Sequence, residues 1–145
     1  MMKGDGPYRK ILLPTDGSEN AQNAMRTCLE LARLFGAKVT TISVVDVASF
    51  SSASQGYILP DMYSYADKAA EASVAEVIKE AKVMGVEAKA IVSRGSPSSE
   101  IIELSKSHDL VIMGTHGRGK ISHAILGSVA EKVVRFAYCP VMVIK

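Results

Sequence analysis

Three glycines and a serine in the last third of the sequence have a spacing that can bind an anion. They form the pattern G-x2-G-x9-G-S, at Gly114, Gly117, Gly127 and Ser128. An apolar run of strand length, residues 110–113, comes directly before the first glycine. Ser128 and Glu131 fit a capping box, in which the serine is the N-cap of a following helix. Because the first amides of a helix lack partners and carry the positive end of its dipole, the pattern favours phosphate.

The same stretch can be compared with better-known nucleotide motifs and with an ordinary loop. Residues 114–120 match the G-x4-G-K part of a Walker A loop, but Ile121 stands where Ser or Thr should hold Mg²⁺. A dinucleotide fingerprint that begins at Gly117 fails at its third glycine, where Ser122 stands. The alternative is a surface loop whose glycines only turn the chain. We interpret the stretch as a phosphate or nucleotide site, in which glycine adopts positive φ or lets the backbone approach a phosphate.

Other polar residues could support such a site. Asp16 follows the first predicted strand, and it either caps the next helix or accepts hydrogen bonds from a nucleoside. His116 lies among the glycines and could donate to phosphate. Arg118 and Lys120 either neutralise outer phosphates or belong to a solvated basic loop. The three histidines are too scattered for a metal site, and we predict no catalytic residues and no metal ligands.

Composition and charge restrict the class of protein. The 145 residues suit one domain, 1–145, and 48% hydrophobic with 22% charged residues is typical of a soluble globular chain. The net charge of +2 gives no strong field for nucleic acid or an anionic membrane, and the apolar runs are only strand-sized. Cys28 and Cys139 make no disulfide framework, and the first ten residues lack the apolar core of a signal peptide. We predict a cytoplasmic protein in which Cys28 is a buried structural thiol.

Strand-like and helix-like segments alternate along the chain. Strands are predicted at 10–15, 38–47, 86–93, 110–113 and 140–145, and helices from the turn 16–19 to about 35 and at 64–84, 97–107 and 128–136. The stretch 48–63 has no sustained period and is predicted to be a long mobile loop.

This alternation predicts an α/β fold, a single doubly wound domain with a five-stranded parallel sheet and helices on both faces. With strand order 3-2-1-4-5 the winding reverses between the first and fourth strands, which end at Asp16 and Gly114. Both candidate regions would therefore meet in one crevice.

Four segments of the chain closely resemble the universal stress protein family. They are PTDGSE after the first strand, SVVD at the end of the second, MGTHGRGKISHAILGSVAEKV, and CPVMVIK. The resemblance covers nearly the whole chain, and G-x2-G-x9-G-S is the specific mark of the ATP-binding branch of the family. It implies the sheet order given above and a homodimer.

The resemblance also implies roles for individual residues. Asp16 and the backbone at Val44 would hold the adenosine part of ATP. The phosphates would be surrounded by Gly114, His116, Gly117, Gly127, Ser128 and Val129. The strand ends would line the pocket with Pro14, Thr15 and Met113. The expected cofactor is ATP with Mg²⁺.

A homodimer also has a physical argument. Val141–Ile144 would form an apolar edge strand, and pairing with its symmetry mate is the simplest way to cover it. We expect an ATP-binding stress-response or signalling module whose nucleotide state alters the mobile loop and hence a partner. The alternatives are a slow nucleotide hydrolase or phosphotransferase using Lys120 and Arg118, and a ligand-free interaction module.

Overall fold

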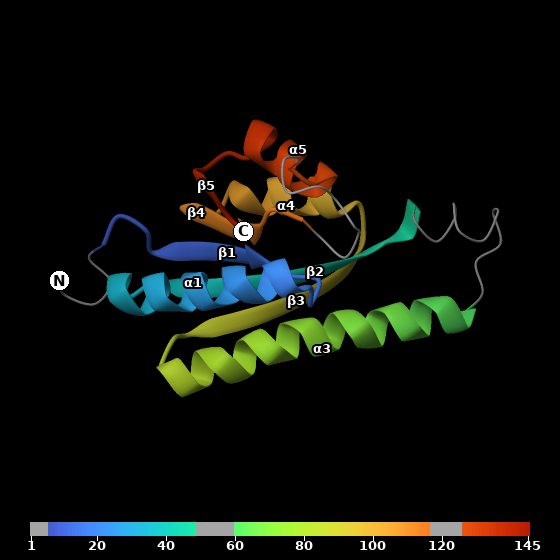
Figure 1. The fold of residues 1–145 in the computed structure, drawn as a ribbon, viewed down its shortest axis with the longest axis horizontal. Coiled ribbons are helices and arrows are strands. Elements are labelled where there is room, and N and C mark those ends of the chain that lie inside the picture. Colours follow the sequence, from blue (N-terminus) through green and yellow to red (C-terminus); the bar gives the residue numbers. More distant parts are fainter. Residues whose placement is uncertain (1–5, 49–59, 117–125) are drawn as a thin grey trace.

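The computed structural model describes residues 6–48, 60–116 and 126–145, whose elements alternate as the sequence predicts (Figure 1). The strands are β1 (Lys10–Pro14), β2 (Lys38–Asp46), β3 (Ala88–Gly95), β4 (Leu110–Gly114) and β5 (Val141–Ile144). The helices are α1 (Glu19–Phe35), α3 (Pro60–Met84), α4 (Pro97–Ser105) and α5 (Ser128–Phe136). None of the described helices combines the length and apolar character that a membrane span requires.

The five strands are parallel and lie in the order β3-β2-β1-β4-β5, which confirms the predicted topology. In the centre, Leu12 of β1 is in register with Thr40 of β2 and Val111 of β4. β1 is buried from its second residue onward, because helices cover the sheet on both sides and a central parallel strand can then be apolar throughout. The edge strands β3 and β5 retain exposed residues.

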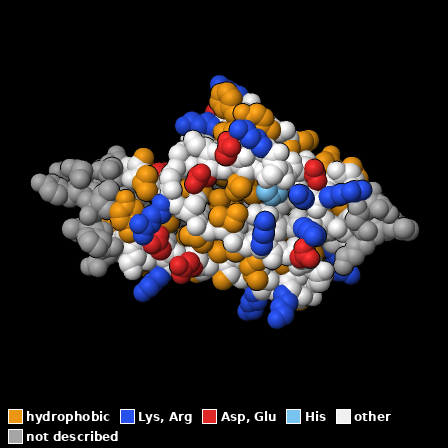
Figure 2. Space-filling model, turned by 180° about the vertical axis from the view of Figure 1, so that it is seen from behind, with side chains coloured by type: hydrophobic (Ala, Val, Ile, Leu, Met, Phe, Trp, Pro, Cys, Tyr) orange, Lys and Arg blue, Asp and Glu red, His pale blue; other side chains and the backbone are white. Residues whose placement is uncertain are grey.

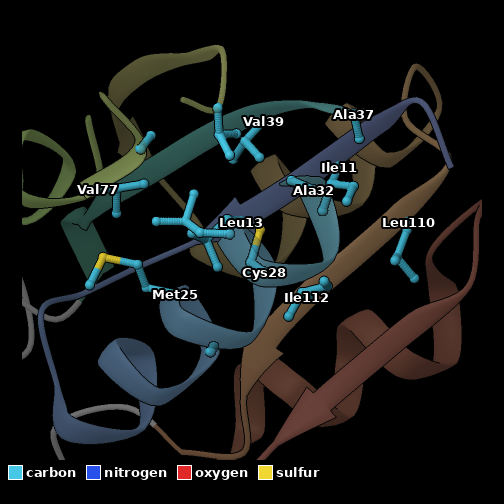
Figure 3. Packing of buried hydrophobic residues seen from close by; sticks show 14 residues of the cluster. Ile11, Leu13, Met25, Cys28, Ala32, Ala37, Val39, Val77, Leu110 and Ile112 are labelled. Atoms are coloured by element: carbon cyan, nitrogen blue, oxygen red, sulfur yellow. The ribbon is translucent and has the colours of Figure 1, made fainter. Parts of the chain in front are cut away.

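Different helices cover the two faces of the sheet (Figure 1). Side chains along a strand alternate between faces, so Ile11 and Leu13 point to one side and Leu12 to the other. On the first side α1 and α3 pack around a cluster that includes Ile11, Leu13 and Val77 (Figure 3). On the second side α4 and α5 pack around Leu12 and Ile101. The pocket described below opens on this second side.

The first cluster also confirms the prediction for Cys28, which is completely buried there. Burial raises the pKa of the Cys28 thiol to about 12. Cys139 is half-buried, and its pKa is raised by burial and, to a smaller extent, by the Asp109 carboxylate. Both cysteines are free thiols, as the sequence predicts.

The largest difference from the predicted elements is the start of α3. The helix begins at Pro60 and not at Ser64, because proline fits the first turn of a helix, where its missing N–H is not needed. Tyr63 is therefore helical, and the Arg94 guanidinium lies 4.4 Å from the centre of its ring. Residues 49–59 of the predicted mobile loop lie outside the described residues.

Candidate functional site

A pocket of about 530 Å³ opens at the carboxyl ends of β1, β2 and β4, with the starts of α4 and α5 as its other walls. Its volume is in the range of small-molecule sites. It lies where the winding of the sheet reverses between β1 and β4, which is the predicted crevice. The structure brings the following predicted site residues together in its lining: Pro14, Thr15, Asp16, Val44, Met113, Gly114, His116, Gly127, Ser128 and Val129. Gly117 lies outside the described residues.

The turn after β1 fixes Thr15 and Asp16 at the pocket. The Thr15 amide donates to the Ile42 carbonyl of β2 (2.9 Å), so the turn continues the sheet. The Ser18 amide donates to Oδ1 of Asp16 (2.9 Å), and the Ser18 hydroxyl accepts from the Ala21 amide (3.2 Å). Ser18, and not Asp16, is therefore the N-cap of α1. Asp16 is instead held in an Asx turn that fixes its carboxylate in the pocket wall.

The start of α5 differs from the predicted capping box, which was wrong. The N-cap is Gly127 and not Ser128, and no side chain of the described residues caps the helix. The Gly127 amide donates to the Thr115 carbonyl (2.8 Å), and this contact fixes the chain so that the helix starts one residue earlier than the capping box requires. The Glu131 carboxylate pairs with Arg135 instead. Because the first three residues of α5 line the pocket, the amino end of the helix borders it, as at many anion sites.

Gly114 and Gly127 are glycines because protein atoms approach them closely. A Cβ on Gly114 would lie 2.9 Å from the Cβ of Asn20 in the first turn of α1. A Cβ on Gly127 would lie 2.9 Å from the Thr115 carbonyl oxygen. Neither is among the glycines with positive φ in the described residues, so this part of the prediction was wrong for these two positions. Their role is to let α1 and α5 pack tightly against the end of β4.

Thr115 joins three parts of the pocket wall, and the sequence did not predict this role. Its amide donates to the Ile144 carbonyl of β5 (2.9 Å), and its carbonyl accepts from the Gly127 amide. Its hydroxyl lies 3.1 Å from Nδ1 of His116. No pattern in the sequence distinguishes this threonine, because its role depends on segments that meet only in the folded sheet.

The pocket has an apolar part formed by β2, α4 and β4. Its side chains are Ile42, Val44, Pro97, Ile101 and Met113. Val44 and Met113 were predicted. The period of two along β2 could have indicated Ile42 as well, because alternate residues share a face. Pro97 and Ile101 could not be predicted from spacing, since the position of α4 over β2 is set by tertiary packing.

Asp16 and Asp46 are the carboxylates in the described pocket lining. Asp46 ends β2, and its Oδ1 accepts from the Ala48 amide (3.1 Å). In the part of the chain that the structure describes, no group of three or more His, Cys, Asp and Glu side chains could hold a metal ion. Mg²⁺ bound together with a nucleotide needs only one or two carboxylates besides phosphate oxygens and water. The donors present therefore fit a nucleotide-bound Mg²⁺ better than a protein metal cage.

Comparison with known proteins supports a single family. The family model described as "Universal stress protein family" matches residues 7–145. The universal stress protein MJ0531 of Methanocaldococcus jannaschii is 35% identical over 144 residues, which cover 98% of this chain and 85% of the relative.

Solved structures agree with this assignment. The structure of MJ0577 from the same organism superposes with a TM-score of 0.82 at 30% identity and covers 95% of this chain and 96% of its own. A universal stress protein from Archaeoglobus fulgidus, solved in complex with dAMP, shares the fold at a TM-score of 0.59 and 20% identity, over 95% and 98% of the two chains. On the basis of the family model and the MJ0531 identity, this chain belongs to the universal stress protein family.

Proposed function

We propose that the pocket at the carboxyl ends of β1, β2 and β4 binds ATP with Mg²⁺. In this proposal the protein is a stress-response or signalling module, and the bound nucleotide sets its state. The cytoplasmic location stays a prediction from the sequence.

The observation that carries the proposal is the division of the pocket into two chemically different parts. Ile42, Val44 and Ile101 offer an apolar surface, which suits a flat aromatic base. The amino end of α5 and the backbone around Gly127 offer amides and a positive dipole, which suit phosphate groups. Asp16 adds a carboxylate of the kind that accepts hydrogen bonds from ribose hydroxyls.

The family relation supports an adenine nucleotide as the ligand. The Archaeoglobus fulgidus relative of the same fold was solved with dAMP. Both that ligand and ATP present an adenine base and a phosphate to a pocket. The glycine pattern that resembles the ATP-binding branch of the family extends the proposal from an adenine nucleotide to ATP.

We propose binding, and not turnover, as the function of the site. Asp16 and Asp46 each accept a backbone amide of their own turn, at 2.9 and 3.1 Å. These hydrogen bonds hold each carboxylate in one orientation at the pocket wall. Both residues therefore suit the fixing of hydroxyls or a nucleotide-bound Mg²⁺.

We also propose a homodimer that pairs through β5. This strand is at the edge of the sheet, and Met142 on it is 37% exposed. Phe136 and Tyr138, just before it, are 57% and 65% exposed. A second copy that extends the sheet would cover both the open edge and these side chains.

Isothermal titration calorimetry of the full chain with ATP and Mg²⁺ tests the proposed ligand. We expect saturable binding well below millimolar nucleotide, and no repeated release of phosphate in a parallel turnover assay. An absence of binding at millimolar ATP would overturn the proposal and favour the ligand-free module. Repeated turnover would favour the hydrolase alternative.

A further inference from the structure

A second pocket, of about 460 Å³, lies at the opposite ends of the strands. It is lined by the amino ends of β1, β2 and β3 and by Ser107 and His108, which follow α4. It shares no lining residue with the nucleotide pocket. The two pockets therefore occupy the two ends of the same sheet.

Three lysines from three neighbouring strands line this second pocket. Lys10 is in register with Lys38, and Lys89 is in register with Thr40. Leu12 is the register partner of Thr40 and packs beneath α4 and α5. Because side chains alternate between faces along each strand, the three lysines and Thr40 lie on the same face of the sheet as Leu12. Adjacent strands are only about 4.8 Å apart, so the backbones of the three lysines lie within two strand spacings of one another at this end of the sheet. Seen from behind, the molecule carries several Lys and Arg side chains near a histidine, with Asp and Glu side chains among them (Figure 2).

The positive charge of this pocket is only weakly balanced. The Glu87 carboxylate also lines the pocket and lies 3.3 Å from Lys38 Nζ, but both side chains are about 70% exposed, so water screens the pair. In the described part of the chain, Lys10 and Lys89 have no ion-pair partner. Asp109 lies close by, and its carboxylate accepts two backbone amides at the start of β1. Like charges on directly opposite strand positions destabilise a sheet, so the Lys10–Lys38 pair has no structural advantage of its own.

Thr40 supplies an independent sign of a ligand. Its side chain lines the pocket although the residue is only 5% exposed. Ser93 Oγ is the one side-chain polar atom of the described residues that is sealed from solvent without a hydrogen bond. The Thr40 hydroxyl, which has no partner in those residues either, therefore opens into the pocket. A hydroxyl that opens into a pocket bonds water there, and a ligand with an acceptor oxygen can take the place of that water.

His108 presents a further polar atom to the same space. Its Nδ1 lies 2.7 Å from the Leu104 carbonyl oxygen, which can only accept, so Nδ1 carries the proton of this hydrogen bond. In the neutral ring the second nitrogen, Nε2, is then an acceptor, which suits a hydroxyl group of a ligand in the pocket that His108 lines.

We propose that this second pocket binds a small molecule that carries phosphate groups. Lys10, Lys38 and Lys89 provide the charge, and the Thr40 hydroxyl provides a directed donor. Lysine is a common phosphate ligand because it acts as a mobile point charge. The volume and the concave shape fit a small molecule, whereas a nucleic acid would need a basic surface that continues beyond the pocket. The site is independent of the proposed ATP pocket.

Titration of the isotope-labelled full chain with inorganic pyrophosphate, followed by NMR, tests this proposal. We expect saturable shifts at Thr40, Lys89 and His108. The double substitution Lys10→Gln and Lys89→Gln should weaken binding roughly tenfold, since phosphate affinity depends on the number of paired charges. The change Thr40→Val preserves shape and should weaken binding several-fold. The matched control is Lys68→Gln with Lys79→Gln on α3, which removes the same charge on the opposite face of the sheet and should leave the affinity unchanged.

Three outcomes would overturn the proposal. The first is an absence of shifts at these residues at millimolar pyrophosphate, including the case in which only the region around Gly127 responds. The second is an equal loss of affinity in the α3 control, which would indicate a diffuse charge effect. The third is an affinity for single-stranded oligonucleotides that exceeds that for pyrophosphate and rises with length, which would indicate a nucleic-acid surface.

Discussion

Replacement of Gly127 by alanine tests whether the tight start of α5 builds the candidate site. In the structure, a Cβ at this position would lie 2.9 Å from the Thr115 carbonyl oxygen and 3.3 Å from the His116 Cα. The backbone angles, φ −60° and ψ 155°, are acceptable for alanine, so dihedral strain contributes nothing. The contact distance is what alanine cannot satisfy, and the start of α5 must move away from the end of β4.

The expected cost follows from the contacts that this movement breaks. Overpacking of a tight position costs about 1–3 kcal/mol. Lengthening the Gly127–Thr115 hydrogen bond, now 2.8 Å, adds about 1 kcal/mol. A more restricted unfolded chain offsets about 0.4–1 kcal/mol of this. The sum is a loss of about 2 kcal/mol, which for a domain of this length lowers the melting temperature by about 4–8 °C.

Thermal unfolding with and without ATP and Mg²⁺ separates the structural effect from the binding effect. We expect nucleotide to raise the melting temperature of the original protein. Gly127→Ala should lose stability without nucleotide and should also lose most of this expected increase, because Thr115, Ser128 and Val129 in the pocket wall shift with it. Gly85→Ala is the matched control. Gly85 has φ 71°, and a Cβ added there would meet no other atom within 4 Å. Alanine at this position, which is remote from the candidate site, therefore costs about 1–2 kcal/mol through backbone strain alone.

Either of two results would refute this reasoning. If Gly127→Ala unfolds at the temperature of the original protein, the close contact with Thr115 does not limit the side chain. If Gly85→Ala loses the effect of nucleotide to the same extent, the loss reflects lower stability and not the geometry of the pocket. Binding by Gly127→Ala with full affinity would also remove the start of α5 from the proposed phosphate site.

Three further predictions concern Asp16, β5 and Cys28. Asp16→Asn keeps the Oδ1 that accepts the Ser18 amide, so stability should hold while ATP affinity in calorimetry falls roughly tenfold; an unchanged affinity would exclude a ligand role. The carbonyls of Pro140 and Ile144 accept from the amides of Val111 and Thr115, so by alternation the Val143 amide faces the open edge of the sheet. Val143→Pro removes this amide and should dissociate the dimer in sedimentation while preserving the protomer, whereas an unchanged mass would contradict pairing through β5. The Cys28 thiol ionises near pH 9 when unfolded and near pH 12 when folded, so the unfolded state loses its proton first as the pH rises. The free energy of unfolding should therefore fall above about pH 9, by at most about 1.4 kcal/mol per unit, and the same denaturation series on Cys28→Ala should lack this part of the slope.

The sheet could be predicted from the sequence because its signals are local. Apolar runs, glycines at helix ends and Pro97 at a helix start each act over a few residues, and strict alternation then leaves few possible topologies. The crevice followed, because in a doubly wound sheet the reversal point is set by strand order. Asp16 and Gly127 are far apart in the chain, yet the strand order alone is enough to assign them to one pocket.

The details at the start of α5 could not be predicted, because they depend on contacts between distant segments. Ser128 and Glu131 carry the correct residues for a capping box, but the hydrogen bond from Gly127 to Thr115 takes precedence over this local preference. The glycine at position 114 has a similar explanation. Its reason is the first turn of α1, and no pattern near position 114 reveals that Asn20 lies against it.

The short length of α4 explains why both pockets exist on one face of the sheet. With nine residues it is about 14 Å long, whereas β2, also of nine residues, extends for about 30 Å. Ile101 of α4 packs in one cluster with Ile42, the middle residue of β2. Both ends of the strand stay uncovered, the end at Asp46 beside the candidate functional site and the end at Lys38 beside the basic pocket. On the opposite face α3 has 25 residues and is about 37 Å long, enough to cover a strand completely. A helix rises less per residue than a strand, so the nine residues of α4 leave ligand-sized space at both ends of β2. Lengthening α4 by two turns would fill one of these two pockets.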